Sequence, residues 1–227
     1  HSVLGLTEIG AVRATNDMAE VGLNAANVRA EVAINPESEL IPVTRANGVL
    51  LALSAPQASA SSVITGTSAL IQLDGWTWEE LTLKAPIGLH VVWPSGEVPP
   101  WLPAEVAEAA KKAVTEKQRG LRRAFEQARA YGLAEQAGTV AVPDLRLAAM
   151  QPALKREQAV FLHADDAVSI GAALDFAAEF KLRAVLVGGA EAWRLADRLR
   201  AQEVPVILGG THVLPQRRFD AVDAIYA

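Results

Sequence analysis

The chain has 227 residues, of which 51% are hydrophobic and 21% charged, so it is long enough for a substantial core and its composition is not that of a disordered segment. The net charge of −5 argues against nucleic acid as a partner, because phosphate backbones require a basic surface. The absence of cysteine excludes disulfides, thiolate nucleophiles and cysteine-ligated metals, and no apolar run approaches the roughly 20 residues that span a bilayer. We therefore expect a soluble protein.

The cellular compartment stays open between cytoplasmic and exported, or periplasmic, because exported proteins can also lack cysteine. The sequence opens on His1 and not on methionine. We expect either that a signal peptide has been removed or that the sequence begins inside a longer polypeptide.

The first hundred residues carry weak local patterns. Residues 41–47 have a helical pattern that runs through Gly48 into an expected strand over 49–54. Residues 55–67 are rich in Ser, Ala and Gly without periodicity, which predicts a loop. A further strand is expected within residues 81–93, ending in the sequence Leu-His-Val-Val-Trp.

Beyond a loop or linker at 95–100, residues 103–131 predict a long helix rich in Ala, Lys, Glu and Arg. A proline is tolerated at the first helical position, so Pro103 suits its start, and Gly132 marks its expected end.

The clearest order lies over residues 158–209. Three apolar runs at 158–163, 182–187 and 204–208 alternate with helical patterns at 167–180 and 191–202. The run centres are about 20 to 25 residues apart, which is typical of βαβ units with helical crossovers. The sequence therefore predicts an α/β protein with a parallel sheet, either a barrel or a doubly wound open sheet.

In parallel α/β folds, ligands gather at the carboxyl ends of the strands. This rule selects His163 and the following Asp165 and Asp166, of which either aspartate could instead cap the next helix. An imidazole at a strand end can bind a metal or act as a base, or it can be a hydrogen-bonded residue near the core.

The other strand ends and histidines allow similar alternatives. The turn Gly188-Gly189 and the segment from Gly209 to His212 close the next two strands. The glycine turns could approach a phosphate, although neither forms a complete nucleotide-binding motif. A solvated loop residue is the favoured interpretation of His212, and a buried core residue that of His90, which lies between Leu89 and Val91.

Three segments resemble one family in their order and spacing. Residues 3–13 (VLGLTEIGAVR), 35–49 (NPESELIPVTRANGV) and 161–165 (FLHAD) are similar to the amidohydrolase superfamily, specifically its imidazolonepropionase-related group. The resemblance implies a TIM-type (β/α) barrel with a metal held by strands one, five, six and eight. It also implies that residues 1–227 form one barrel domain of roughly strands one to seven, incomplete in this chain. The β-sandwich that accompanies such barrels is expected to be absent from this sequence.

The resemblance transfers few of the family's metal ligands. The family's first strand ends in His-x-His, and the matching residues here are His1, Ser2 and Val3. The strand-five histidine maps onto His163, whereas the strand-six histidine falls on the glycine turn at 188–189. The resemblance thus implies His163 and His1 as ligands of a divalent metal, zinc first. His212 could be a third ligand only if its loop folds inward, at a position that the family does not normally use. The rule of strand ends adds a pocket at Asp165, Gly188, Gly189 and Thr211.

Three functions remain open on these residues. The first is a metal-dependent hydrolase acting on C–N bonds of small amides or cyclic amides. The second is a family member that has lost hydrolysis and acts as a binding or scaffolding module. The third is an open sheet that binds a phosphorylated ligand at its glycine turns. Because an incomplete barrel exposes strand edges, we also expect further segments, or a homo-oligomer partner, to cover them.

Overall fold

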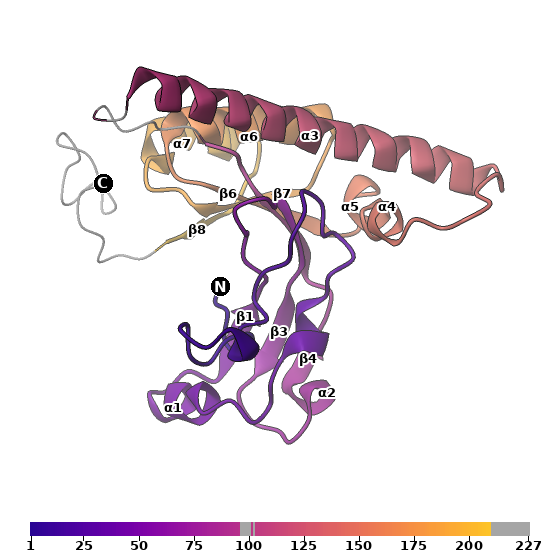
Figure 1. The fold of residues 1–227 in the computed structure, drawn as a ribbon. Helices are drawn as coiled ribbons and strands as arrows, with labels where there is room; N and C mark the ends of the chain where they lie inside the picture. The colour runs from indigo at the N-terminus through magenta and orange to yellow at the C-terminus, as the bar shows by residue number, and fades with distance from the viewer. Residues whose placement is uncertain (96–100, 102, 210–227) are drawn as a thin grey trace.

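The computed structural model describes residues 1–95, 101 and 103–209, which build two β-sheets and a set of helices (Figure 1). The large sheet has five strands in the order β2-β5-β6-β7-β8, and the small sheet has three in the order β1-β3-β4. The helices are α1 (Leu40–Ala46), α2 (Trp78–Leu81), α3 (Ala104–Gln136), α4 (Leu145–Ala149), α5 (Gln151–Leu154), α6 (Ala167–Glu179) and α7 (Ala196–Ala201), with short 3-10 helices at Arg13–Thr15, Ala30–Ala33 and Ala192–Leu195.

The large sheet is mostly parallel. Strands β5 (Gly88–Val92), β6 (Ala159–Ala164), β7 (Ala184–Gly188) and β8 (Val206–Leu208) all pair in parallel. The edge strand β2 (Ile64–Thr67) pairs with β5 in antiparallel. The predicted α/β fold with a parallel sheet is therefore confirmed. Over the described residues the sheet is open and no closed barrel is formed.

The helices α3, α6 and α7 all lie on one side of the large sheet (Figure 1). Alternate residues of each strand point toward them, as the pleat of a strand requires. In β6, for example, Val160 and Leu162 belong to the core beneath the helices, while Phe161 belongs to a small cluster on the opposite face. The helix-covered core is the larger of the two, and it includes the fully buried Phe125, Met150 and Ile170.

Three helices end in the same way before a parallel strand. After α5, α6 and α7 the chain places Arg156, Lys181 and Glu203 in the left-handed region, at φ of 63°, 56° and 52°. Each residue donates its N–H to a carbonyl three residues back, and the next N–H reaches a carbonyl five residues back, for example from Leu182 to Ala177 at 2.8 Å. This is the Schellman arrangement, which usually carries glycine at the left-handed position.

Helix α3 is longer than its sequence pattern predicts. It continues through Gly132 to Gln136, whereas we expected the glycine to end it. The glycine serves a close crossing: a Cβ at this position would overlap the side-chain amide of Gln151. That amide donates to the carbonyls of Ala128 and Leu147, at 2.8 Å each, and so joins α3 to α4 and α5.

The small sheet as a whole was not predicted, although the expected strand over 49–54 is confirmed as its strand β1. Strands β1 (Leu51–Ser54), β3 (Ala69–Gln72) and β4 (Thr82–Lys84) pair in antiparallel, and their own core contains Leu6, Ile34, Ile41, Ile71 and Leu81. The expected loop over 55–67 was wrong at its end, since its last four residues form β2. Strands β2, β3 and β4 have three or four residues each, and the β2–β5 and β3–β4 pairs have irregular register, so they leave little periodicity to detect.

The two sheets share one antiparallel ribbon. Strand β2 runs into β3 through the single residue Ser68, and β4 runs into β5 across the cis Ala85–Pro86 peptide. Backbone hydrogen bonds between Ser68 and Gly88 (3.1 Å) and between Ile87 and Ser68 (2.8 Å) continue the pairing across the joint.

The assignment of residues 1–227 to one barrel domain stays a prediction. Within the described part of the chain, no helix is long and apolar enough to cross a membrane.

Candidate metal centre

Two histidines lie on the face of the large sheet that the helices leave uncovered. His90 is in β5 and His163 in the neighbouring β6, where Phe161 pairs with His90 and Val92 pairs with His163. Residues that pair across strands share a face, as do residues two apart along one strand. His90, Phe161 and His163 therefore project to the same side, away from α3 and α6.

His1 reaches the same place from the start of the chain. Ser2 forms a parallel bridge with Ser54 of β1, its N–H donating to Leu53 at 2.8 Å and its carbonyl accepting from Ala55 at 2.9 Å. The N-terminus accordingly lies between the two sheets (Figure 1). The His1 ring centre is 5.4 Å from that of His90, in a stacked arrangement, and 5.0 Å from that of His163.

The three imidazoles form a compact set of metal donors. One nitrogen from each of His1, His90 and His163 lies within 4.8 Å of the other two, and Nδ1 of His90 is 2.9 Å from Nε2 of His163. Tetrahedral Zn²⁺ with Zn–N bonds of about 2.0–2.1 Å would separate its donors by about 3.4 Å. The three donor nitrogens need only a small change in position to reach this spacing. His1 is exposed and has room to move. Among the described residues, no carboxylate joins this group.

Burial keeps the two inner histidines neutral. It lowers the pKa of His90 to about 3, with a further lowering from the charge that His163 would carry. Burial also lowers the pKa of His163 to about 4. A metal ligand must offer an unprotonated nitrogen. Both rings are neutral at neutral pH, so each has one unprotonated nitrogen. Because Nδ1 of His90 and Nε2 of His163 share one proton in the 2.9 Å hydrogen bond between them, one ring must change its tautomer before both nitrogens can bind a metal.

His90 has features beyond those of an ordinary core histidine. It is fully buried, as its apolar neighbours predict, and its ring stacks on Phe161 with centres 4.6 Å apart and planes 3° apart. Its Nε2, however, has no hydrogen-bond partner among the described residues. Buried polar atoms without partners are rare and call for an explanation. A neutral imidazole that offers Nδ1 to a metal carries its proton on Nε2, so a metal at Nδ1 would not supply the missing partner of Nε2.

Asp165 and Asp166, which follow β6, form hydrogen bonds with the backbone of nearby segments. The Asp166 carboxylate accepts from the Ser169 N–H at 2.8 Å and caps α6, as one sequence interpretation allowed. The Asp165 carboxylate accepts from the Ala190 N–H at 3.4 Å, and its carbonyl accepts from the Glu191 N–H at 2.8 Å. Both aspartates therefore help to set the geometry of the loops at this end of the sheet.

The glycine turn after β7 is required by close packing. Gly188 has φ of 97°, and a Cβ on it would lie 2.5 Å from Oδ1 of Asp165. Gly189 has φ of 69° and donates to the Ala164 carbonyl at 2.8 Å. Neither offers a side chain to a metal. Thr211 and His212, predicted at the pocket and as a third ligand, lie outside the described residues.

Sequence reasoning passed over His90 as a site residue. The rule of strand ends selects His163, but His90 lies in mid-strand. A usable signal was present: Leu89 and Val91 are the apolar residues of an alternating strand, so His90 must face the opposite side. Knowing that this side is also that of His163 requires the register between β5 and β6.

The fold is similar to that of a known amidohydrolase. The crystal structure of an amidohydrolase from Thermotoga maritima MSB8 matches with a TM-score of 0.81 at 24% sequence identity. The match covers 96% of this chain and 57% of that chain, so the present chain spans little more than half the length of that amidohydrolase. At this identity the likeness concerns the fold. No protein-family model and no curated protein sequence matches the chain.

Proposed function

We propose that this chain is a metal-dependent amidohydrolase of the imidazolonepropionase-related group, hydrolysing C–N bonds of small amides or cyclic amides. The observation that supports it is the convergence of His1, His90 and His163 within 4.8 Å on a sheet with the fold of an amidohydrolase. A TIM-type barrel, in which β5 to β8 are consecutive parallel strands, belongs to the same proposal. So does a divalent metal, with zinc as the first candidate because imidazole is among its preferred ligands.

Each side chain of the site has a distinct role in this proposal. A bound divalent metal supplies Lewis-acid polarisation of the amide carbonyl and makes a water molecule more acidic. His90 and His163 hold the metal with neutral imidazoles, and the stacked Phe161 keeps the His90 ring in a fixed plane and shields it from water. His1 is exposed, so we place the approach of the substrate on its side.

A second candidate is a binding or scaffolding module with an amidohydrolase fold and little catalysis. Hydrolysis needs a group that takes a proton from water, and no carboxylate joins the three histidines among the described residues. Gly188 and Gly189, at a position where the family resemblance implies a histidine, also offer no side chain. On these grounds metal binding without turnover is the alternative.

Metal analysis combined with histidine variants tests the site. Protein purified without chelator should hold close to one equivalent of zinc, and both H90Q and H163Q should lose most of it. D175N is the control, because it changes an exposed carboxylate of α6 that pairs with Arg198 and is not part of the three-histidine cluster. A metal content below about a tenth of an equivalent, with no gain on reconstitution, would contradict the metal site.

Two further measurements separate the candidates. Removing metal with a chelator should lower the Tm of the parent protein and leave that of H163Q unchanged, since a ligand that binds only the folded state stabilises it. A screen of N-acyl amino acids, dipeptides and lactams then tests turnover. Metal-dependent hydrolysis abolished in H163Q supports the enzyme, whereas a loaded protein without turnover supports the binding module.

A further inference from the structure

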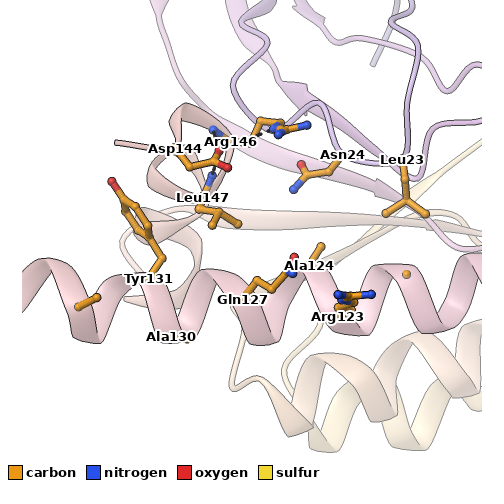
Figure 2. A pocket seen from close by; sticks show the side chains of 12 residues that line it. Leu23, Asn24, Arg123, Ala124, Gln127, Ala130, Tyr131, Asp144, Arg146 and Leu147 are labelled. Atoms are coloured by element: carbon orange, nitrogen blue, oxygen red, sulfur yellow. Dashed lines mark hydrogen bonds and ion pairs between the residues drawn. The ribbon is translucent and has the colours of Figure 1, made fainter. Parts of the chain in front are cut away.

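An open groove runs along α3, away from the histidines, and Arg123, Gln127 and Arg146 on its walls are exposed. It has a volume of about 760 Å³ and lies between α3, the segment Leu23–Asn24 and the start of α4 (Figure 2). Small-molecule sites commonly occupy about 300–1,000 Å³. None of the three histidines lines it, so its occupant would be independent of the metal centre.

The walls of this groove are held together at both ends. At one end Leu23 packs over Gly120 of α3, where a Cβ would come within 2.6 Å of the leucine side chain. At the other end the Gln151 side-chain amide lies against Gly132 of α3. It donates hydrogen bonds to the carbonyls of Ala128 and Leu147. The spacing between α3 and the opposite wall is therefore set by packing, and a ligand would meet a groove that is already formed.

Polar side chains of α3 form a stripe along the groove. Arg123, Gln127 and Tyr131 follow at intervals of four residues, which places them on one face of the helix. In Figure 2 the wall that carries Asn24 and Arg146 lies opposite α3. The groove thus combines two guanidinium groups with amides, a phenol and a small apolar floor.

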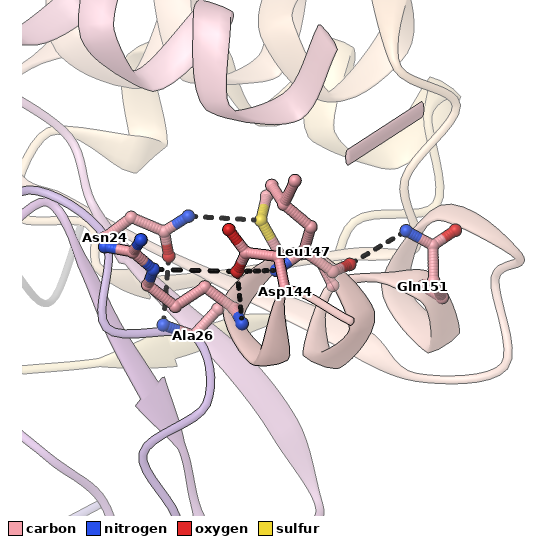
Figure 3. A network of polar contacts seen from close by, with 7 residues as sticks. Asn24, Ala26, Asp144, Leu147 and Gln151 are labelled. Carbon is pink, nitrogen blue, oxygen red and sulfur yellow. Dashed lines mark hydrogen bonds and ion pairs between the residues drawn. The ribbon is translucent and has the colours of Figure 1, made fainter. Parts of the chain in front are cut away.

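The side-chain oxygens of Asp144 and Asn24 in the groove already accept hydrogen bonds (Figure 3). The Asp144 carboxylate accepts from the N–H groups of Arg146 and Leu147, at 2.9 and 3.3 Å, and lies 3.7 Å from the Arg146 guanidinium. The Asn24 carbonyl oxygen accepts from the Ala26 N–H at 3.0 Å. Among the residues that the structure describes, Asp144 is the only acidic one that lines the groove.

Two donors of the groove, the Asn24 amide and the solvent-exposed Arg123 guanidinium, are not paired with a strong acceptor. The amide nitrogen of Asn24 has only the Met150 sulfur at 3.5 Å, which is a weak acceptor. Arg123 has no ion-pair partner among the described residues. Two arginines against one engaged carboxylate make the groove locally cationic, in a chain whose net charge is −5.

We propose that this groove binds a small organic anion, a carboxylate or phosphate group carried on an aromatic or apolar body. Guanidinium groups bind both kinds of oxyanion through paired, charge-assisted hydrogen bonds. Arg123 and Arg146 contact the anionic group from opposite walls, and the Asn24 amide donates to it. Tyr131 and the apolar floor, which includes Ala124 and Leu147, contact the body of the ligand.

Calorimetric titration with phenyl phosphate, benzoate and uncharged benzyl alcohol tests the proposal and distinguishes the two oxyanions. We expect saturable binding of at least one anion and none of the alcohol. R123Q and R146Q should each weaken binding by roughly tenfold, the size expected for a hydrogen bond to a charged group. R119Q is the matched control: it removes the same charge from the same helix, at a residue that does not line the groove and pairs with Glu116.

Side-chain amide NMR signals give a second measurement that does not depend on the variants. Signals of Asn24 and Gln127 should shift on addition of the anion, while that of Gln72 in the small sheet should not. No saturable binding up to about 10 mM, tenfold above a weak millimolar affinity, would overturn the proposal. An equal loss of affinity in R119Q would also overturn it, because it would mean attraction by overall charge. Thermal unfolding of each variant verifies that it is folded.

Discussion

At the scale of single residues, two buried imidazoles make the stability of the fold depend on pH. The pKa of His90 is lowered to about 3 and that of His163 to about 4, against an ordinary value of 6.5. Between about pH 6.5 and 4 the unfolded chain therefore binds protons that the folded chain does not. Stability is complete above this window and falls as the pH decreases through it.

The metal-free protein should lose up to roughly 1.4 kcal/mol of stability per pH unit for each of these histidines below pH 6.5. Urea unfolding from about pH 8 to about pH 5 measures the slope in a range where most carboxylates stay ionised. H163F removes one of the two titrating groups and should roughly halve the slope. An unfolding free energy that is constant over this range would contradict the neutral, buried state of the pair.

A glycine beside the site gives a second prediction at this scale. A Cβ on Gly88 would overlap the Phe161 ring, which is buried and stacked on His90. G88A should therefore destabilise the protein by about 1–3 kcal/mol, the usual cost of overpacking.

The matched control for G88A is G171A, in the middle of α6. There a Cβ would meet only a guanidinium nitrogen of Arg198 at 3.8 Å, so alanine should stabilise the helix by up to about 1 kcal/mol. Denaturant unfolding of both variants measures the two changes, which should have opposite signs. Equal effects would mean that the Phe161 ring is free to move aside.

At the scale of elements, the repeated helix ending before β6, β7 and β8 is the clearest regularity of the fold. Arg156, Lys181 and Glu203 occupy left-handed positions where a side chain is strained and glycine is not. Each position directly precedes a parallel strand, so it sets the direction in which the chain enters the sheet.

Replacing Lys181 or Glu203 with glycine should raise stability by about 0.5–1 kcal/mol each, because the strain is relieved while the Schellman hydrogen bonds remain. The control is Q202G, one residue earlier, where φ is −95° and glycine should only destabilise. Thermal and urea unfolding measure these changes. Destabilisation by K181G would indicate that the lysine side chain makes a contact worth more than the strain.

The predictability of each element follows from its length and burial. The strands at 159–164 and 184–188 were predicted because long apolar runs between charged residues indicate buried parallel strands. Strands β2, β3 and β4 were not predicted, since three or four residues are too few to show an alternation of apolar and polar side chains. The predicted helix end at Gly132 was wrong because the sequence does not distinguish a glycine that ends a helix from one that lets a neighbouring side chain pack closely against it. The proximity of His90 and His163 on one face could not be predicted without the register of two strands that lie about 70 residues apart in sequence.

At the scale of the whole molecule, the two sheets cannot separate without breaking a continuous ribbon. Ser68 alone joins β2 to β3, and the pairing of this arm with β4 and β5 extends on both sides of the joint. Leu53 of β1 also packs against the cluster of Phe161 and Val187 on the large sheet. Although each sheet has its own core, we infer that they unfold as one cooperative unit.

A cavity in the small core tests this coupling. Ile71 is fully buried there, and I71A should lower the unfolding free energy by about 2–5 kcal/mol. If the sheets are one unit, hydrogen exchange of the Leu162 amide in β6 should accelerate by the factor that corresponds to this loss, although β6 belongs to the other sheet. V21A, at a side chain that is 86% exposed, should leave the exchange unchanged. Faster exchange confined to β1, β3 and β4 would mean that the small sheet opens alone.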